Sequence, residues 1–288
     1  MPDIEHAIMA KDLHRTYNGR VAVDGISFVV KAGEVFGFLG PNGAGKTTTI
    51  RMLTAQLRPT SGTAQVAGCD IVTQRPDLKT RIGVVFEDQN IYERMTAREN
   101  LMFYAQLYRV KPVRVQEVLE QMRLADRANE PVGRFSNGMK QRLIIARALL
   151  HHPRVLFLDE PTRGLDPVMG REIRGLIADL ARQGMTIFLT THYMEEADQL
   201  CQRVAIVDQG QIIALDAPAR LKRQIAPQDD QVVVTTSDGQ SDTLHLQQAP
   251  DQQKLVAWIQ QGQLVDIHSP TVTLEDVFIQ LTGRSLNS

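Results

Sequence analysis

Gly40-Pro41-Asn42-Gly43-Ala44-Gly45-Lys46-Thr47 decides the fold of this chain, and Thr48 continues the stretch. It follows the apolar run Val35–Leu39 and fits the pattern of a phosphate-binding loop (P-loop) between a buried strand and a helix. The glycines let backbone N–H groups turn towards an anion, Lys46 can reach the β- and γ-phosphates, and Thr47 offers a hydroxyl group to Mg²⁺. A Gly-rich turn without a ligand is the alternative, and the strand and helix context argues against it.

A second apolar run, at residues 155–158, ends in the carboxylates Asp159 and Glu160. Beside a phosphate-binding loop this arrangement is typical of a Walker B motif, in which Asp159 holds Mg²⁺ and Glu160 accepts a proton from the attacking water. Two acids at a strand end can also belong to a solvated loop, which is the weaker interpretation here. A GTPase is the nearest competing class, but the sequence lacks the guanine-reading Asn-Lys-x-Asp pattern.

Apolar runs without alternation recur through the first two thirds of the chain, at residues 35–39, 82–86, 155–158, 186–190 and 204–207. Such runs suit strands buried on both faces of a parallel sheet, so the sequence predicts an α/β fold. Segments 26–31 and 63–67 predict shorter strands in an antiparallel flap. Between about 88 and 150 the helical period dominates, and Thr96 with Glu99 has the pattern of a capping box.

The composition shifts after Arg223, where Gln and Asp become frequent. Segments 232–236 and 243–246 predict a hairpin around an Asp-Gly turn at 238–239. A helix at about 251–261, a strand at 264–267 and a helix at 274–281 capped by Thr273 complete the tail. We therefore predict a nucleotide-binding domain at 1–224, with a helical subdomain at about 88–150, and a small α+β domain at 225–288.

Composition and charge argue against several kinds of binding partner and location. The 32 basic and 33 acidic residues give a formal charge of −1, so no nucleic-acid partner is expected. Cys69 and Cys201 have no metal-ligand spacing and indicate a reduced, cytoplasmic protein. No apolar run approaches the ~20 residues of a membrane-spanning helix, and residues 1–5 lack a basic signal-peptide start.

The stretch Phe135-Ser136-Asn137-Gly138-Met139-Lys140-Gln141-Arg142 precedes a helical segment just upstream of the Walker B run. Here the chain resembles the signature motif of ATP-binding-cassette (ABC) ATPases, which implies the ABC cassette fold of P-loop NTPases. Ser136 and the N–H groups after it would stand at a helix N-terminus, which favours an anion. A serine at that position is usually a simple N-cap, so the motif gains its weight from its place in the chain.

The resemblance extends to other positions, from about 17 to 192. It implies that Tyr17 stacks on adenine, that Asp166 in Gly164-Leu165-Asp166-Pro167 links two nucleotide sites, and that His192 contacts the γ-phosphate. In the family, the signature motif of one subunit closes over the γ-phosphate held by the P-loop of another. A lone Tyr or His is more often a packing or surface residue, but six features stand here in family order.

Two departures from the family pattern bear on the site. Asn137 and Met139 replace the usual Gly and Gln of the signature, and we expect the loop to tolerate them because Asn adopts left-handed backbone angles. Glu87 stands where the family usually has a glutamine that touches Mg²⁺ and the attacking water. A carboxylate can ligate the metal but cannot donate a hydrogen bond. Our hypothesis gives Glu87 the metal-facing role, with Gln89 as the alternative.

The tail segment 273–284 and the segment 82–101 resemble ATPases of the daunorubicin-resistance, ABC-2 type multidrug exporters. A generic amphipathic helix is the alternative for the tail. The resemblance implies ATP and Mg²⁺ as ligands, a homodimer or pseudo-symmetric dimer of ATPase subunits, and a separate integral membrane permease. The permease would dock in the cleft flanking residues 87–100 and hold the subunit on the cytoplasmic face of the cell membrane.

Two other functions stay open. Soluble ABC ATPases linked to ribosomes or DNA resemble tandem cassettes or cassettes split by coiled coils, whereas this sequence has one cassette, no heptad run and no basic patch. A regulatory subunit that binds ATP but hydrolyses it weakly is the other alternative. Ser136, Glu160 and His192 argue against it, and Glu87 keeps it open.

Overall fold

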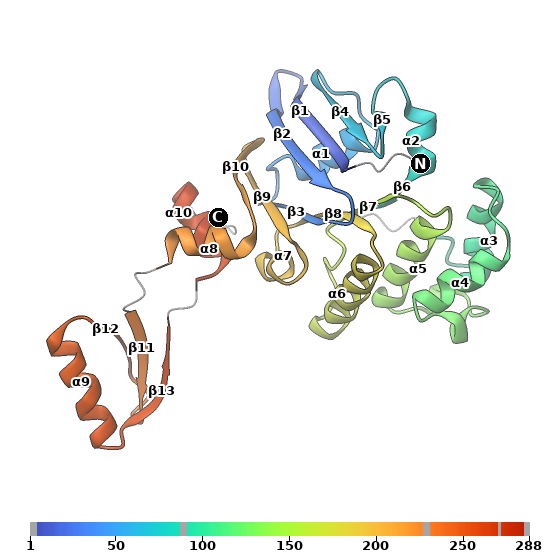
Figure 1. Ribbon diagram of the computed structural model, residues 1–288. Helices are drawn as coiled ribbons and strands as arrows, with labels where there is room; N and C mark the ends of the chain where they lie inside the picture. Colours follow the sequence, from blue (N-terminus) through green and yellow to red (C-terminus); the bar gives the residue numbers. More distant parts are fainter. Residues whose placement is uncertain (1–4, 87–90, 227–230, 270–271, 285–288) are drawn as a thin grey trace. The chain divides into compact units, whose positions relative to one another are not determined.

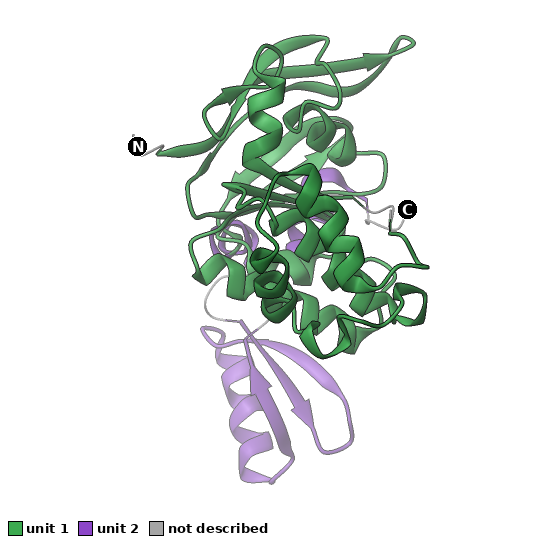
Figure 2. Cartoon of the chain, turned by 90° about the vertical axis from the view of Figure 1, so that its right-hand side faces the viewer, with its two compact units in different colours: residues 1–218, 286–288 green, residues 219–285 purple. Residues whose placement is uncertain are grey.

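The computed structural model describes residues 5–86, 91–226, 231–269 and 272–284. The chain divides into two compact units, residues 1–218 with 286–288 and residues 219–285 (Figure 2). The domain boundary predicted after residue 224 stays a prediction.

A six-stranded sheet with the order β10-β9-β3-β8-β7-β6 forms the centre of the first unit (Figure 1). Its strands are β3 (Val35–Leu39), β6 (Ile82–Val85), β7 (Val155–Asp159), β8 (Thr186–Thr191), β9 (Arg203–Asp208) and β10 (Gln211–Asp216). The first five pair in parallel, as predicted, and every residue of β3, β7 and β8 is buried. The antiparallel edge strand β10 was missed because its residues are only partly buried and form no long apolar run.

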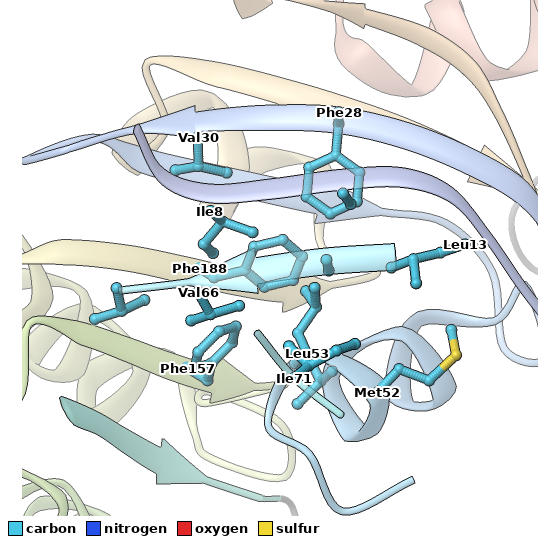
Figure 3. Packing of buried hydrophobic residues seen from close by; sticks show 14 of the residues in the cluster. Ile8, Leu13, Phe28, Val30, Met52, Leu53, Val66, Ile71, Phe157 and Phe188 are labelled. Carbon is cyan, nitrogen blue, oxygen red and sulfur yellow. The ribbon is translucent and has the colours of Figure 1, made fainter. Parts of the chain in front are cut away.

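An antiparallel sheet with the order β2-β1-β4-β5 packs on this core. Its strands are β1 (His6–Tyr17), β2 (Arg20–Lys31), β4 (Ser61–Val66) and β5 (Cys69–Asp70). The predicted flap is confirmed, but β1 was not predicted and β2 is longer than expected, because register shifts between the two strands break their alternation. The Phe188 ring centroid lies 5.5–5.9 Å from those of Phe28, Phe36, Phe38 and Phe157. Phe28 of the antiparallel sheet and Phe157 and Phe188 of the core sheet lie in the same hydrophobic cluster, which holds the two sheets together (Figure 3).

Helices cover the core sheet and carry the insert between β6 and β7 (Figure 1). Around the sheet lie α1 (Lys46–Leu53), α2 (Arg75–Arg81), α6 (Pro167–Arg182) and α7 (Met194–Leu200). The insert holds α3 (Ala97–Leu107), α4 (Val113–Gln121), the short 3₁₀ turns Ala125–Arg127 and Val132–Arg134, and α5 (Asn137–Leu149). The predicted capping box of Thr96 and Glu99 opens α3. Within the described residues, no helix combines the length and the apolarity that crossing a membrane requires.

The second unit begins in α8 and contains a small antiparallel sheet with the order β12-β11-β13. Its elements are α8 (Pro218–Ile225), β11 (Gln231–Thr236), β12 (Ser241–His245), α9 (Ala249–Gln260), β13 (Leu264–His268) and α10 (Leu274–Thr282). The hairpin turns at Gly239, whose φ is +81°, and Thr273 caps α10. The α+β tail predicted from the sequence is thus confirmed.

Candidate nucleotide-binding site

The phosphate-binding loop joins the end of β3 to the start of α1. Gly43 and Gly45 have φ values of +82° and +100°, which side chains rarely adopt. A Cβ on Gly45 would also lie 2.5 Å from the Ala22 carbonyl oxygen, so the loop requires glycine there. No side chain caps α1, and the N–H groups of its first turn have no partner within the helix. This helix end is therefore able to donate several hydrogen bonds to a phosphate.

Lys46 is 6% exposed, and its ammonium group is held over the loop. Nζ donates to the carbonyl oxygens of Gly40 at 2.7 Å and Pro41 at 3.1 Å. It also lies 3.2 Å from Glu160 Oε1. The predicted phosphate-binding cation and the predicted Walker B base are thus in direct contact.

Glu160 joins this lysine to the predicted γ-phosphate histidine. Its second oxygen, Oε2, lies 2.7 Å from His192 Nδ1. The residue has a φ of +51°, a backbone conformation that costs about 1–3 kcal/mol for a non-glycine residue. Its N–H donates to the Thr190 carbonyl at 3.0 Å, which fixes this turn against β8. The residues next to Glu160 in the sequence did not predict this turn, because the turn is stabilised by β8, which lies about 30 residues further along the chain.

Asp159 is 3% exposed and stands beside two threonine hydroxyl groups. Burial raises the pKa of Asp159, and hydrogen bonds from Thr190 and Thr47 oppose that shift. Thr190 Oγ1 donates to Oδ1 at 2.5 Å. The carboxylate and the Thr47 hydroxyl are oxygen ligands of the kind that Mg²⁺ takes together with phosphates and water, so this pair fits the ion. The third predicted ligand, Glu87, lies outside the described residues, as does Gln89.

The signature segment forms the N-terminus of α5. Ser136 is exposed and caps this helix by accepting a hydrogen bond from Met139 N at 3.3 Å. Asn137 is the exposed first residue of α5, and it is not among the described residues with positive φ. The prediction that the loop tolerates Asn137 through left-handed backbone angles was therefore wrong. A helical, solvent-facing position accepts Asn without strain. Gly138 is the restricted position, because a Cβ there would lie 2.7 Å from Met169 Sδ.

Asp166 caps α6, and this helix connects it to the signature segment. Its carboxylate accepts hydrogen bonds from the N–H groups of Val168 at 2.9 Å and Met169 at 3.0 Å. Met169 in turn packs against Gly138. Asp166 and the signature segment are therefore connected within one chain through Met169 in the first turn of α6. The sequence did not indicate this connection.

Tyr17 ends β1 and is 40% exposed. The Arg15 guanidinium lies over its ring, with Cζ 4.6 Å from the centroid. The exposed ring is compatible with stacking on a base. The structure thus joins Lys46, Thr47, Asp159, Glu160 and His192 in one cluster, and presents Tyr17, Ser136 and Asp166 as exposed side chains outside it.

This cluster on a parallel α/β core defines a P-loop nucleotide-binding cassette. Residues 23–163 match the profile of a family described as ABC transporter. The chain is 43% identical over 267 residues to a fluoroquinolones export ATP-binding protein of Mycobacterium tuberculosis, with 92% of this chain and 89% of the relative covered. It belongs to the ABC transporter family and is one of its ATP-binding subunits.

Other relatives also carry export or resistance in their names. A daunorubicin resistance ATP-binding protein of Streptomyces coeruleorubidus is 36% identical, with 97% of this chain and 96% of the relative covered. A Nod factor export ATP-binding protein of Paraburkholderia xenovorans is 37% identical, with 98% and 99% covered. The resemblance to exporter ATPases stated from the sequence is confirmed.

Solved structures show the same cassette. The chain superimposes with a TM-score of 0.69 and 29% identity on cbiO1 of Clostridium perfringens, with 75% of this chain and 90% of that chain covered. It superimposes with a TM-score of 0.65 and 26% identity on an ATP-binding cassette solved as a dimer bound to ADP and Pi, with 73% and 98% covered.

Proposed function

We propose that this subunit hydrolyses ATP and thereby drives a separate membrane permease of an ABC-2 type exporter. The observation that carries the proposal is the bridging position of Glu160, which contacts both Lys46 and His192. The export names of the relatives support the direction of transport.

The residues of the cluster divide the chemistry of hydrolysis among them. Lys46 moves from the Gly40 carbonyl to the β- and γ-phosphates, which frees Glu160 Oε1 to accept the proton of the attacking water. His192 orients the other oxygen of Glu160 and stands beside the γ-phosphate. Thr47 and Asp159, together with Glu87, would hold Mg²⁺, which neutralises charge on the phosphates.

The second half of each site comes from another subunit, identical or homologous. Ser136 and the N-terminus of α5 are exposed and can donate to a γ-phosphate held by a partner. Two ATP molecules would then hold the dimer closed, and loss of the γ-phosphate contacts would let it open. The relative solved as a dimer with ADP and Pi supports this arrangement.

The permease would dock on an exposed apolar surface in the helical insert, which we define as Tyr92, Phe103 and Leu107. These side chains are 49%, 46% and 68% exposed. The rings of Tyr92 and Phe103 meet edge to face at 5.5 Å. Exposed aromatic side chains are typical anchors of protein interfaces, and a short cytoplasmic helix could cover this surface. Such a complex would place the subunit on the cytoplasmic face of the membrane.

Affinity purification from detergent-solubilised native membranes tests this function. We expect a polytopic membrane protein to accompany the tagged subunit, and Phe103→Glu to reduce its yield by about tenfold or more, because a buried charge replaces an anchor. Val256→Glu, at a 49% exposed position of α9, is the matched control and should leave the yield unchanged. Ribosomes or DNA as the main companion would contradict the proposal.

A further inference from the structure

Between α6 and α7, an acid and a base bury polar atoms that have no hydrogen-bond partner. Glu196, on α7, is 1% exposed, and both of its carboxyl oxygens are buried without a hydrogen bond. Arg174, on α6, likewise buries its Nε without a hydrogen-bond partner. A buried polar group without a partner destabilises the conformation that contains it, so another conformation that pairs the two would be favoured.

The surroundings of Glu196 place the two groups in the same region. Burial raises the pKa of Glu196, while the hydroxyl groups of Thr191 and Thr162 and the charge of Arg174 oppose the shift. A Cβ on Gly170 would lie 3.6 Å from Arg174 Nη1 and 4.0 Å from Thr162 Cβ. The guanidinium and the Thr162 side chain therefore both lie beside Gly170 in the first turn of α6, and Thr162 also acts on Glu196.

Helices α6 and α7 lie next to two different parts of the proposed nucleotide site, the Asp166 segment and the His192 segment. Thr191 directly precedes His192, and Glu196 lies one helical turn after it. The first turn of α6 contains Met169, which packs against Gly138 of the signature segment, and Asp166 caps this helix. Since α6 and α7 already pack together, an ion pair between them would join the histidine segment to the surface that is proposed to face the partner subunit.

We propose that Glu196 and Arg174 form an ion pair when the ATP-bound dimer closes, and that this pair couples the His192 segment to the Asp166 segment. The inference rests on the ATP-driven dimerisation proposed above. Both are positioning residues, because the His192–Glu160–Lys46 cluster contains the groups that face the nucleotide. With this pair, closure of the dimer around a nucleotide would depend on the position of α6, the helix that Asp166 caps.

A double-mutant cycle measured in two states tests this coupling. The parent is the Glu160→Gln protein, and the variants are Glu196→Gln, Arg174→Gln and the double change. With ATP, sedimentation should show each single change raising the dimer dissociation constant about tenfold, and the double change raising it by about the same factor rather than a hundredfold. Without nucleotide, the coupling between the two shifts of the urea midpoint should be weaker than the coupling in the ATP dimer, because Arg174 and Glu196 then interact only through space and not in a direct ion pair.

Two matched variants separate charge pairing from packing. Arg174→Lys keeps the charge and should stay within about threefold of the parent, and Arg171→Gln, an exposed position on the same helix, should show no coupling to Glu196→Gln. Additive effects on the ATP dimer, or equal coupling without nucleotide, would overturn the inference. A parent that stays monomeric with ATP would instead overturn the proposed function, and this inference with it.

Discussion

Glu160→Gln is expected to lower the ATP hydrolysis rate by a factor on the order of 10²–10⁴, the usual contribution of a general base. The amide keeps the size of the side chain and can still contact Lys46 and His192, but it cannot accept the proton of the attacking water. ATP therefore binds without being consumed, and the closed dimer should accumulate.

Phosphate release and gel filtration with ATP measure the two effects together. Glu195→Gln, an exposed carboxylate on α7, is the matched control and should keep both the rate and the monomer–dimer balance. A Glu160→Gln protein that hydrolyses ATP at nearly the normal rate would rule out Glu160 as the base.

Lys46→Ala is expected to weaken ATP binding by about a hundredfold, because it removes a charge-assisted contact to two phosphates. The change also deprives the buried Glu160 carboxylate of a cationic partner at 3.2 Å. Loss of that partner should lower the free energy of unfolding by about 1–3 kcal/mol, partly compensated by His192.

Titration with a fluorescent ATP analogue and urea unfolding measure these two losses separately. Lys79→Ala removes an exposed lysine of α2 and serves as the control, with no change expected in either measurement. Normal ATP affinity in Lys46→Ala would show that the loop holds the nucleotide through its backbone alone.

The sequence predicted the elements whose signals are local. The apolar run of β3 and the glycines after it placed the strand, loop and helix correctly. Thr96 and Thr273 marked the starts of α3 and α10, because a capping box is written in four consecutive residues. The edge strand β10 and the long strand β1 had no such signal, since irregular pairing and partial burial hide the period of two.

The candidate site was predicted as residue types in family order, but its geometry was not. Contacts such as Lys46 with Glu160 depend on how β3 and β7 are placed by β8 between them. The positive φ of Glu160 and the packing of Met169 on Gly138 likewise arise from tertiary structure. Asn137 shows the converse: its tolerance follows from an exposed helical position rather than from a left-handed turn.

The central claim is that each ATP is held by two subunits at once, one through Lys46 and the other through Ser136. The most direct measurement mixes two inactive variants, Lys46→Ala and Ser136→Arg, and follows phosphate release. In a mixed dimer, one of the two nucleotide sites combines an intact Lys46 with an intact Ser136. When equal amounts of the two variants pair at random, half of the dimers are mixed. The mixture should therefore recover roughly a quarter of the normal rate. A mixture no more active than the separate variants would contradict the claim.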